Sequence, residues 1–107
     1  GSVEEVEASG SYKRYFMHKT SHYLGMDVHD VGRYFDQGKP RPLEPGVVIT
    51  VEPGLYFSPE APEAAARYRG IGVRIEDDVA ITTAGCEVLT AGLPRTPDEV
   101  ERVMRAA

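Results

Sequence analysis

The sequence predicts an α+β fold in which short strands come first and one helix closes the chain. Residues 47–51 and 71–75 are rich in the β-branched side chains that strands favour. The segment that starts at Thr96 carries several agreeing signals for the beginning of a helix. Strands and helices do not alternate regularly along the chain, which favours the α+β class over the α/β class.

Composition indicates a globular chain and argues against two classes of partner. Hydrophobic residues make up 41% of the 107 residues, which is enough for a core, and the net charge is −5. Lysine and arginine are scattered singly, so we expect no nucleic-acid partner. No purely aliphatic run is longer than residues 47–49, so we expect no membrane partner. The single cysteine, Cys86, and an acidic N-terminus without a secretory signal fit a cytoplasmic location.

The first part of the chain is expected to hold a short helix and loops. Val3 and Val6 permit a helix that Gly10 ends. Residues 12–17 are rich in aromatic side chains and are expected to be extended. Residues 36–46 hold three prolines and two glycines, which indicates a surface loop that ends in a turn.

The rest of the chain is expected to form the sheet and the closing helix. After the strand at residues 47–51, the Pro-Gly pair that follows Glu52 bends the chain. Further extended segments, separated by turns or loops, are expected at residues 55–57, 71–75, 79–83 and 87–90. Thr96 can cap the closing helix, and Glu99 completes a capping box. The apolar side chains on one face of this helix are Val100, Val103 and Met104.

Two charged residues occupy one face of a predicted strand. Successive side chains of a strand point to opposite faces, so Arg74 and Glu76 share a face that excludes Val73 and Ile75. A buried charge needs a partner, because burying it alone is costly. The spacing leaves two interpretations equally open: an inward functional pair, or an Arg–Glu pair on a solvated sheet face.

Glu52 stands at a strand end, on the face that also carries Val48 and Thr50. An acid at this position can be aimed as a metal ligand, and it can equally end the strand in water. Because strand ends face water so often, this feature alone favours the solvent-facing interpretation.

All three histidines of the chain, His18, His22 and His29, lie between residues 17 and 30. On a helix, His18 and His22 would share a face and could bind one metal ion. The zincin pattern is absent, since Lys19 stands where its glutamate would be. Imidazole and carboxylate together suit zinc, manganese or iron. Composition and spacing thus predict a metal or acid–base site.

Three segments, in this order, resemble the pita-bread metallopeptidases. They are residues 18–32, HKTSHYLGMDVHDVG, residues 43–56, LEPGVVITVEPGLY, and residues 68–82, YRGIGVRIEDDVAIT. The resemblance is closer to the Xaa-Pro aminopeptidases (aminopeptidase P) than to the Xaa-Pro dipeptidases (prolidases). It implies that residues 1–107 are the C-terminal half of a pita-bread catalytic domain, a mostly antiparallel curved sheet with a C-terminal helix.

The resemblance also implies an activity and its residues. A family member removes the N-terminal residue from peptides with proline in second position, using two divalent metal ions, most often Mn²⁺, with Zn²⁺ or Co²⁺ as alternatives. The implied metal ligands are His22, Glu52 and Glu76, of which Glu76 bridges both ions. The implied substrate-handling residues are His29, which stabilises the tetrahedral intermediate, His18, beside the proline ring, and Arg74, which supports the metal carboxylates.

Two departures from the family pattern shape the expectations. Lys19 and Thr20 replace a common Gly-Leu pair, a change expected to tune the pocket. The family's two upstream aspartates have no counterpart before Tyr12. We therefore expect the chain alone to be inactive, or to need its other half. A divided sheet exposes an edge and an apolar face, so we also expect pairing with the other half of the same protein or with a second copy.

The sequence leaves three alternative functions to consider. An Xaa-Pro dipeptidase would share the same metal ligands. A non-catalytic pita-bread binding module would be expected to lose those ligands, yet His22, Glu52 and Glu76 are all present. A small metal-binding barrel of the cupin type would carry an HxH pair, which this sequence lacks.

Overall fold

The computed structural model describes residues 1–106, except for the side chain of residue 64. The chain divides into two compact units. Unit 1 comprises Gly1–Thr20 and Glu52–Glu76, and unit 2 comprises Ser21–Val51 and Asp77–Ala107. Each unit is described by itself.

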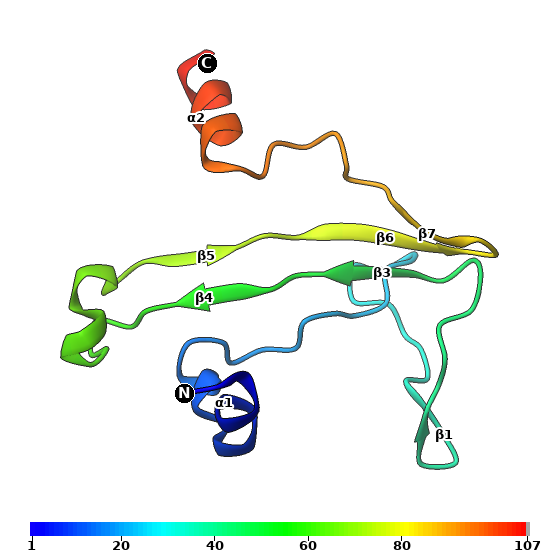
Figure 1. Ribbon diagram of the computed structural model, residues 1–107. Helices are drawn as coiled ribbons and strands as arrows, with labels where there is room; N and C mark the ends of the chain where they lie inside the picture. The colour runs from blue at the N-terminus through cyan, green and yellow to red at the C-terminus, as the bar shows by residue number, and fades with distance from the viewer. Residues whose placement is uncertain (107) are drawn as a thin grey trace. The chain divides into compact units, whose positions relative to one another are not determined.

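Unit 1 combines an antiparallel strand pair with short helices. Helix α1 spans Val3–Ser9 and the 3₁₀ helix η1 follows it at Ser11–Arg14. Strands β4 (Gly54–Tyr56) and β5 (Gly72–Arg74) pair with Gly54 opposite Arg74 and Tyr56 opposite Gly72 (Figure 1). The 3₁₀ helix η2, Glu63–Tyr68, lies between these strands in the sequence.

The buried apolar centre of unit 1 is small and lies around η2. Ala61 and Ala65 are the buried apolar residues within the described part of the chain. The Phe57 ring lies 5.1 Å, between ring centroids, from those of Tyr15 and Tyr68. Most other large apolar side chains of the unit are therefore exposed to solvent.

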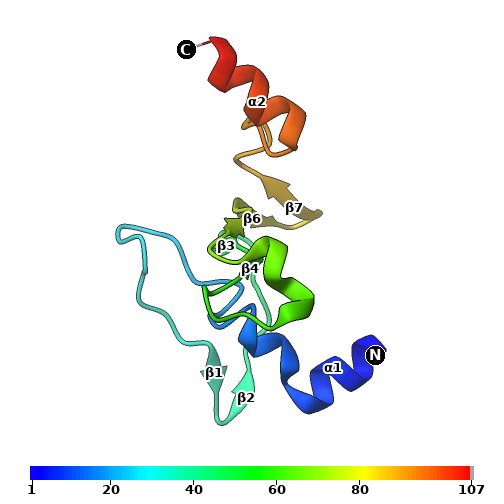
Figure 2. The same ribbon diagram turned by 90° about the vertical axis from the view of Figure 1, so that its left-hand side faces the viewer.

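Unit 2 is built on a three-stranded antiparallel sheet in the order β3-β6-β7. The strands span Val48–Val51, Asp77–Thr82 and Gly85–Val88. Helix α2, Pro97–Ala106, follows β7 after a connecting segment that contains turns (Figure 2). A separate hairpin pairs β1 (Phe35–Asp36) with β2 (Lys39–Pro40).

The predicted class is confirmed, because all described strand pairs are antiparallel and a helix closes the chain. The predicted N-terminal helix is present, and it ends at Gly10, which has a left-handed backbone with φ of 64°. None of the described helices has both the length and the apolar character that a membrane crossing would require.

Two local predictions were wrong. Residues 12–17 were expected to be extended, but η1 occupies their first part, because the left-handed Gly10 turns the chain into a 3₁₀ helix. Residues 36–46 were expected to be a loop, but they begin with a hairpin. Its turn places Gln37 at φ 48° and Gly38 at φ 79°, and tight hairpin turns of type I′ require positive φ at both positions.

One face of the β4–β5 pair is apolar and exposed. Leu55 and Val73, which lie opposite each other, are both 56% exposed, and Ile75 is 46% exposed. With side chains from the N-terminal segment they line a groove of about 440 Å³. The full lining is Tyr12, Phe16, Thr20, Pro53, Gly54, Leu55, Val73 and Ile75.

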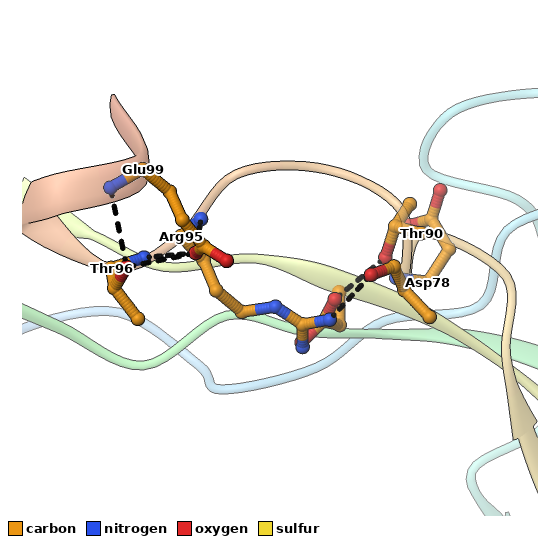
Figure 3. Close-up of polar contacts among 7 residues, drawn as sticks. Asp78, Thr90, Arg95, Thr96 and Glu99 are labelled. Atoms are coloured by element: carbon orange, nitrogen blue, oxygen red, sulfur yellow. Dashed lines mark hydrogen bonds and ion pairs between the residues drawn. The ribbon is translucent and has the colours of Figure 1, made fainter. Parts of the chain in front are cut away.

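Helix α2 begins with the predicted capping box (Figure 3). The Glu99 carboxylate accepts hydrogen bonds from the backbone N–H groups of Thr96, at 3.0 Å, and Arg95, at 3.2 Å. It also accepts from the Thr96 hydroxyl at 2.9 Å. These bonds, the backbone bond from Thr96 first, hold the pKa of Glu99 below its ordinary value of 4.5.

We predict an acid-dependent loss of helix in α2. Because the pKa of Glu99 is lower in the folded chain, ionised Glu99 stabilises the helix fully above the ordinary pKa. That contribution is lost as the pH falls through the lower, folded value. Far-UV circular dichroism between about pH 6 and pH 3 measures the loss.

The Glu99→Gln variant should lose less helical signal over this range than the unmodified chain. The matched control is Glu87→Gln, because Glu87 is an exposed acid of β7 outside the helix. This control should keep the full acid response. An equal response in both variants would contradict the role given to Glu99.

Candidate metal centre

Two glutamates lie directly opposite each other in unit 1. Continuing the β4–β5 register past Gly54 and Arg74 places Glu52 opposite Glu76. The hydrogen bond from Ile75 N–H to the Pro53 carbonyl, at 3.1 Å, supports this continuation. A carboxylate oxygen of Glu52 lies within 4.8 Å of one of Glu76. Like charges in this arrangement destabilise a sheet, so the pair favours a cation.

Glu52 is buried, and the solvent-facing interpretation of this residue is wrong. The residue is 6% exposed. Its backbone N–H donates to the Thr20 carbonyl at 2.7 Å, so a neighbouring segment covers the point at which the strand was expected to open to water. The buried carboxylate accepts a hydrogen bond from Arg74 Nη1 at 3.1 Å.

The ion pair of Arg74 is with Glu52, on the neighbouring strand, whereas one of the two interpretations left open by the sequence paired Arg74 with Glu76 on its own strand. Arg74 Nε donates to the Tyr56 hydroxyl at 2.6 Å. This bond, with smaller contributions from the charges of Glu52 and Glu76, raises the pKa of Arg74 above its ordinary value. Arg74 therefore stays positively charged and offsets part of the negative charge of the two glutamates.

Tyr56 is a site residue that the sequence interpretation missed. Its hydroxyl lies 2.9 Å from His18 Nε2 and also contacts Arg74. His18 Nδ1 lies 2.7 Å from the Lys19 carbonyl, which can only accept, so Nδ1 carries the ring proton of neutral His18. The Tyr56 hydroxyl then donates to His18 and accepts from Arg74. Strand alternation from Glu52 places Tyr56 on the same face, and this signal could have identified it.

The Tyr56 ring fits where it does because two neighbouring residues are glycines. A Cβ built on Gly54 would lie 2.7 Å from the Tyr56 hydroxyl oxygen. A Cβ built on Gly72 would lie 2.9 Å from the Tyr56 ring. Larger residues at either position would displace the ring from Arg74 and His18.

In unit 2, His22 is fixed by β3 through its backbone and by Tyr23 through its ring. The Thr50 hydroxyl accepts from the His22 N–H at 3.1 Å, and the Thr50 N–H donates to the His22 carbonyl at 3.0 Å. His22 Nδ1 lies 2.9 Å from the Tyr23 carbonyl, so Nδ1 is the donor and Nε2 carries the lone pair. Metal-binding histidines commonly donate their second nitrogen in this way.

His29 lies beside His22 in unit 2. Their ring centroids are 4.3 Å apart and the ring planes meet at 63°, an edge-to-face contact. The idea that His18 and His22 share a helix face is wrong, because no helix forms between residues 15 and 34. His18 belongs to unit 1 and contacts Tyr56, whereas His22 and His29 belong to unit 2.

Each unit holds donor atoms of a kind that divalent metal ions bind. Unit 1 provides two opposed carboxylates, Glu52 and Glu76, and unit 2 provides the Nε2 lone pair of His22. Carboxylate oxygen and imidazole nitrogen are common ligands of manganese and zinc. Arg74 leaves the pair with a net negative charge, which suits a cation.

Comparison with protein families assigns the chain to a known family of metallopeptidases. Residues 2–83 match the model of metallopeptidase family M24, and the chain belongs to this family. The Xaa-Pro aminopeptidase of Escherichia coli strain K12 is 54% identical over 107 residues, which are 100% of this chain and 24% of that protein. Human Xaa-Pro aminopeptidase 3 is 40% identical over 106 residues, 99% of this chain and 20% of that protein.

Solved structures agree with the fold. The structure of the Pseudomonas aeruginosa aminopeptidase PepP has a TM-score of 0.91 and 55% identity, and the match covers 99% of this chain and 24% of that one. Zn-substituted E. coli aminopeptidase P in complex with product has a TM-score of 0.87 and 54% identity, with coverage of 99% and 24%. The pita-bread fold class is thereby confirmed, and the chain spans about a quarter of the length of these relatives.

We predict that Thr50 stabilises unit 2 chiefly through its hydroxyl. Thr50 is 1% exposed, and Thr50→Val keeps its shape but leaves the His22 N–H without that acceptor. The loss should lower the free energy of unfolding by about 1–3 kcal/mol, measured by urea denaturation.

The matched control is Thr82→Val, because the Thr82 hydroxyl accepts from Ala84 N–H in an exposed turn that water can reach. This change should cost about 0.5 kcal/mol or less. Equal costs for the two variants would show that burial of the Thr50 hydroxyl is unimportant.

Proposed function

We propose that this chain supplies metal ligands and substrate-handling residues to an Xaa-Pro aminopeptidase. Such an enzyme removes the N-terminal residue from peptides with proline in second position. The observation that carries the proposal is the opposition of Glu52 and Glu76, held beside Arg74 on one sheet face. The similarity to Xaa-Pro aminopeptidases over the whole chain supports it.

The proposed metal ligands are Glu52, Glu76 and His22. Glu52 and Glu76 are opposed across two strands, and Glu76 would bridge two ions. His22 is included because the family resemblance implies it and because its Nε2 carries the lone pair that a metal ion needs. We propose two Mn²⁺ ions, with Zn²⁺ or Co²⁺ as substitutes and further carboxylates from the rest of the enzyme.

When bound, the metal would lower the pKa of a water molecule and polarise the scissile carbonyl. The protein residues around it have separate tasks. Arg74 keeps the buried Glu52 carboxylate in position by an ion pair at 3.1 Å. His29, held edge-on against His22, would donate a hydrogen bond to the carbonyl oxygen that becomes negative when water attacks the peptide bond.

His18 would form one wall of the proline pocket. Its ring lies edge-on to Phe16, with centroids 4.7 Å apart, and to Tyr56, at 5.4 Å. Bonds to Tyr56 and to the Lys19 carbonyl hold the ring in one orientation. A fixed aromatic surface suits the rigid, apolar ring of proline better than it suits a flexible side chain.

A non-catalytic binding module is the less favoured function. Two opposed glutamates would only destabilise such a module, because like charges opposite each other weaken a strand pair. Replacing either Glu52 or Glu76 by a neutral residue would relieve that repulsion. Their joint presence therefore supports a site that binds a cation.

We predict that the chain can replace the matching segment of the E. coli enzyme, to which it is 54% identical over 107 residues. The chimaera, assayed with Mn²⁺, should release the N-terminal residue from Xaa-Pro tripeptides. Glu76→Gln in the chimaera should lower kcat at least about 100-fold. Losing a residue that binds the metal directly should cost more activity than losing a residue that only orients such a ligand.

The control variant is Glu87→Gln, an exposed acid of β7 that should leave kcat unchanged. The isolated 107-residue chain should show no turnover. A chimaera that folds and melts like the E. coli enzyme but cleaves no Xaa-Pro peptide would refute the proposal. Cleavage of Xaa-Pro dipeptides alone would identify a dipeptidase instead.

A further inference from the structure

The carboxylate of Asp77, the residue after Glu76, is held from two directions within unit 2. Its Oδ1 accepts a hydrogen bond from the Thr90 hydroxyl at 2.7 Å. Its Oδ2 accepts one from Arg95 Nη1, also at 2.7 Å. The Asp77 side chain is 22% exposed, so it is largely removed from water. Both bonds involve an ionised group, and such bonds are short and strong.

The same segment also binds the backbone at the start of β6. The Thr90 hydroxyl accepts from Asp78 N–H at 3.1 Å, and Leu89 N–H donates to the Asp78 carbonyl at 2.8 Å. Arg95 Nη2 donates to the Ala91 carbonyl at 3.1 Å, which folds residues 89–95 around its guanidinium. We call these contacts of Asp77, Asp78, Thr90 and Arg95 the clamp.

The clamp acts where β6 extends beyond its ladder with β7. The β6–β7 ladder ends with Val79 opposite Val88, so Asp77 and Asp78 extend beyond it. On their other side they pair only with β3, as Asp77 opposite Val51 and Asp78 opposite Thr50. The contacts from residues 89–95 replace the missing strand neighbour at these two positions.

Fixing Asp77 also restricts Glu76, because the two residues share a peptide plane. Their side chains point to opposite faces of the strand, so a held Asp77 carboxylate sets the direction in which Glu76 points. The repulsion between Glu52 and Glu76 would otherwise turn Glu76 away. We propose that Arg95, acting through Asp77, is a positioning residue for the metal carboxylate of Glu76.

This inference rests on the proposed function, since it gives Glu76 a metal to bind. A merely structural ion pair would fasten the segment before α2 and leave metal affinity unchanged. The experiment therefore measures metal affinity and fold stability separately, in the chimaera with the E. coli enzyme and with Mn²⁺. Isothermal titration calorimetry gives the affinity, and thermal unfolding without metal gives the stability.

Three variants separate the possibilities. Arg95→Met removes the charge and keeps most of the side-chain length, and it should weaken Mn²⁺ binding about 10-fold. Arg95→Lys keeps the charge and should restore binding to within about 3-fold of the unmodified chimaera. The matched control is Arg105→Met, because Arg105 pairs with Glu101 at 2.6 Å on the exposed surface of α2. It should leave binding unchanged.

Amide hydrogen exchange adds a local readout. In Arg95→Met without metal, exchange should accelerate at residues 76–78 and stay unchanged at residues 80–82, which keep the β7 ladder. Unchanged Mn²⁺ affinity in this variant would overturn the inference and leave the proposed function standing. An unmodified chimaera that binds no Mn²⁺ would overturn both.

Discussion

The structure of unit 1 depends on the opposition of two carboxylates, Glu52 and Glu76, across an antiparallel strand pair. Like charges at this position disfavour the pairing, and Glu52 is also buried, so the surrounding residues have to compensate. Arg74 provides one positive charge, and the hydroxyl of Tyr56 fixes Arg74 in place. The remaining negative charge is what makes the site suitable for a divalent cation.

Unit 2 orients its own candidate metal ligand, His22, by hydrogen bonds to backbone and side-chain groups. Thr50 fixes His22 by two hydrogen bonds, and the carbonyl of Tyr23 selects the tautomer in which Nε2 carries the lone pair. The clamp at the start of β6 holds Asp77, the residue that follows Glu76, and so restricts the direction of the Glu76 side chain. Each unit thus orients its ionisable groups by hydrogen bonds, some from neutral groups and some from arginines.

Strand periodicity was sufficient to predict the shared face of Arg74 and Glu76, and Thr96 and Glu99 were sufficient to predict the capping box of α2. The burial of Glu52 could not be predicted from the sequence, because it depends on pairing with Thr20, which is distant in the sequence. The hairpin turn was missed because glutamine rarely adopts the positive φ that Gln37 has. The metal ligands were implied by family resemblance, since spacing alone left a shared helix face open for His18 and His22.

Whether the opposed glutamates repel each other and bind a cation can be tested by thermal unfolding of the unmodified chain and of Glu76→Gln, each with and without Mn²⁺. Without metal, Glu76→Gln should unfold a few degrees higher, because a repulsion of about 1 kcal/mol or less is removed. With Mn²⁺, only the unmodified chain should gain stability, since binding to the folded state raises its unfolding temperature. A metal-free Glu76→Gln chain that is less stable, together with an unchanged response to Mn²⁺, would contradict the account.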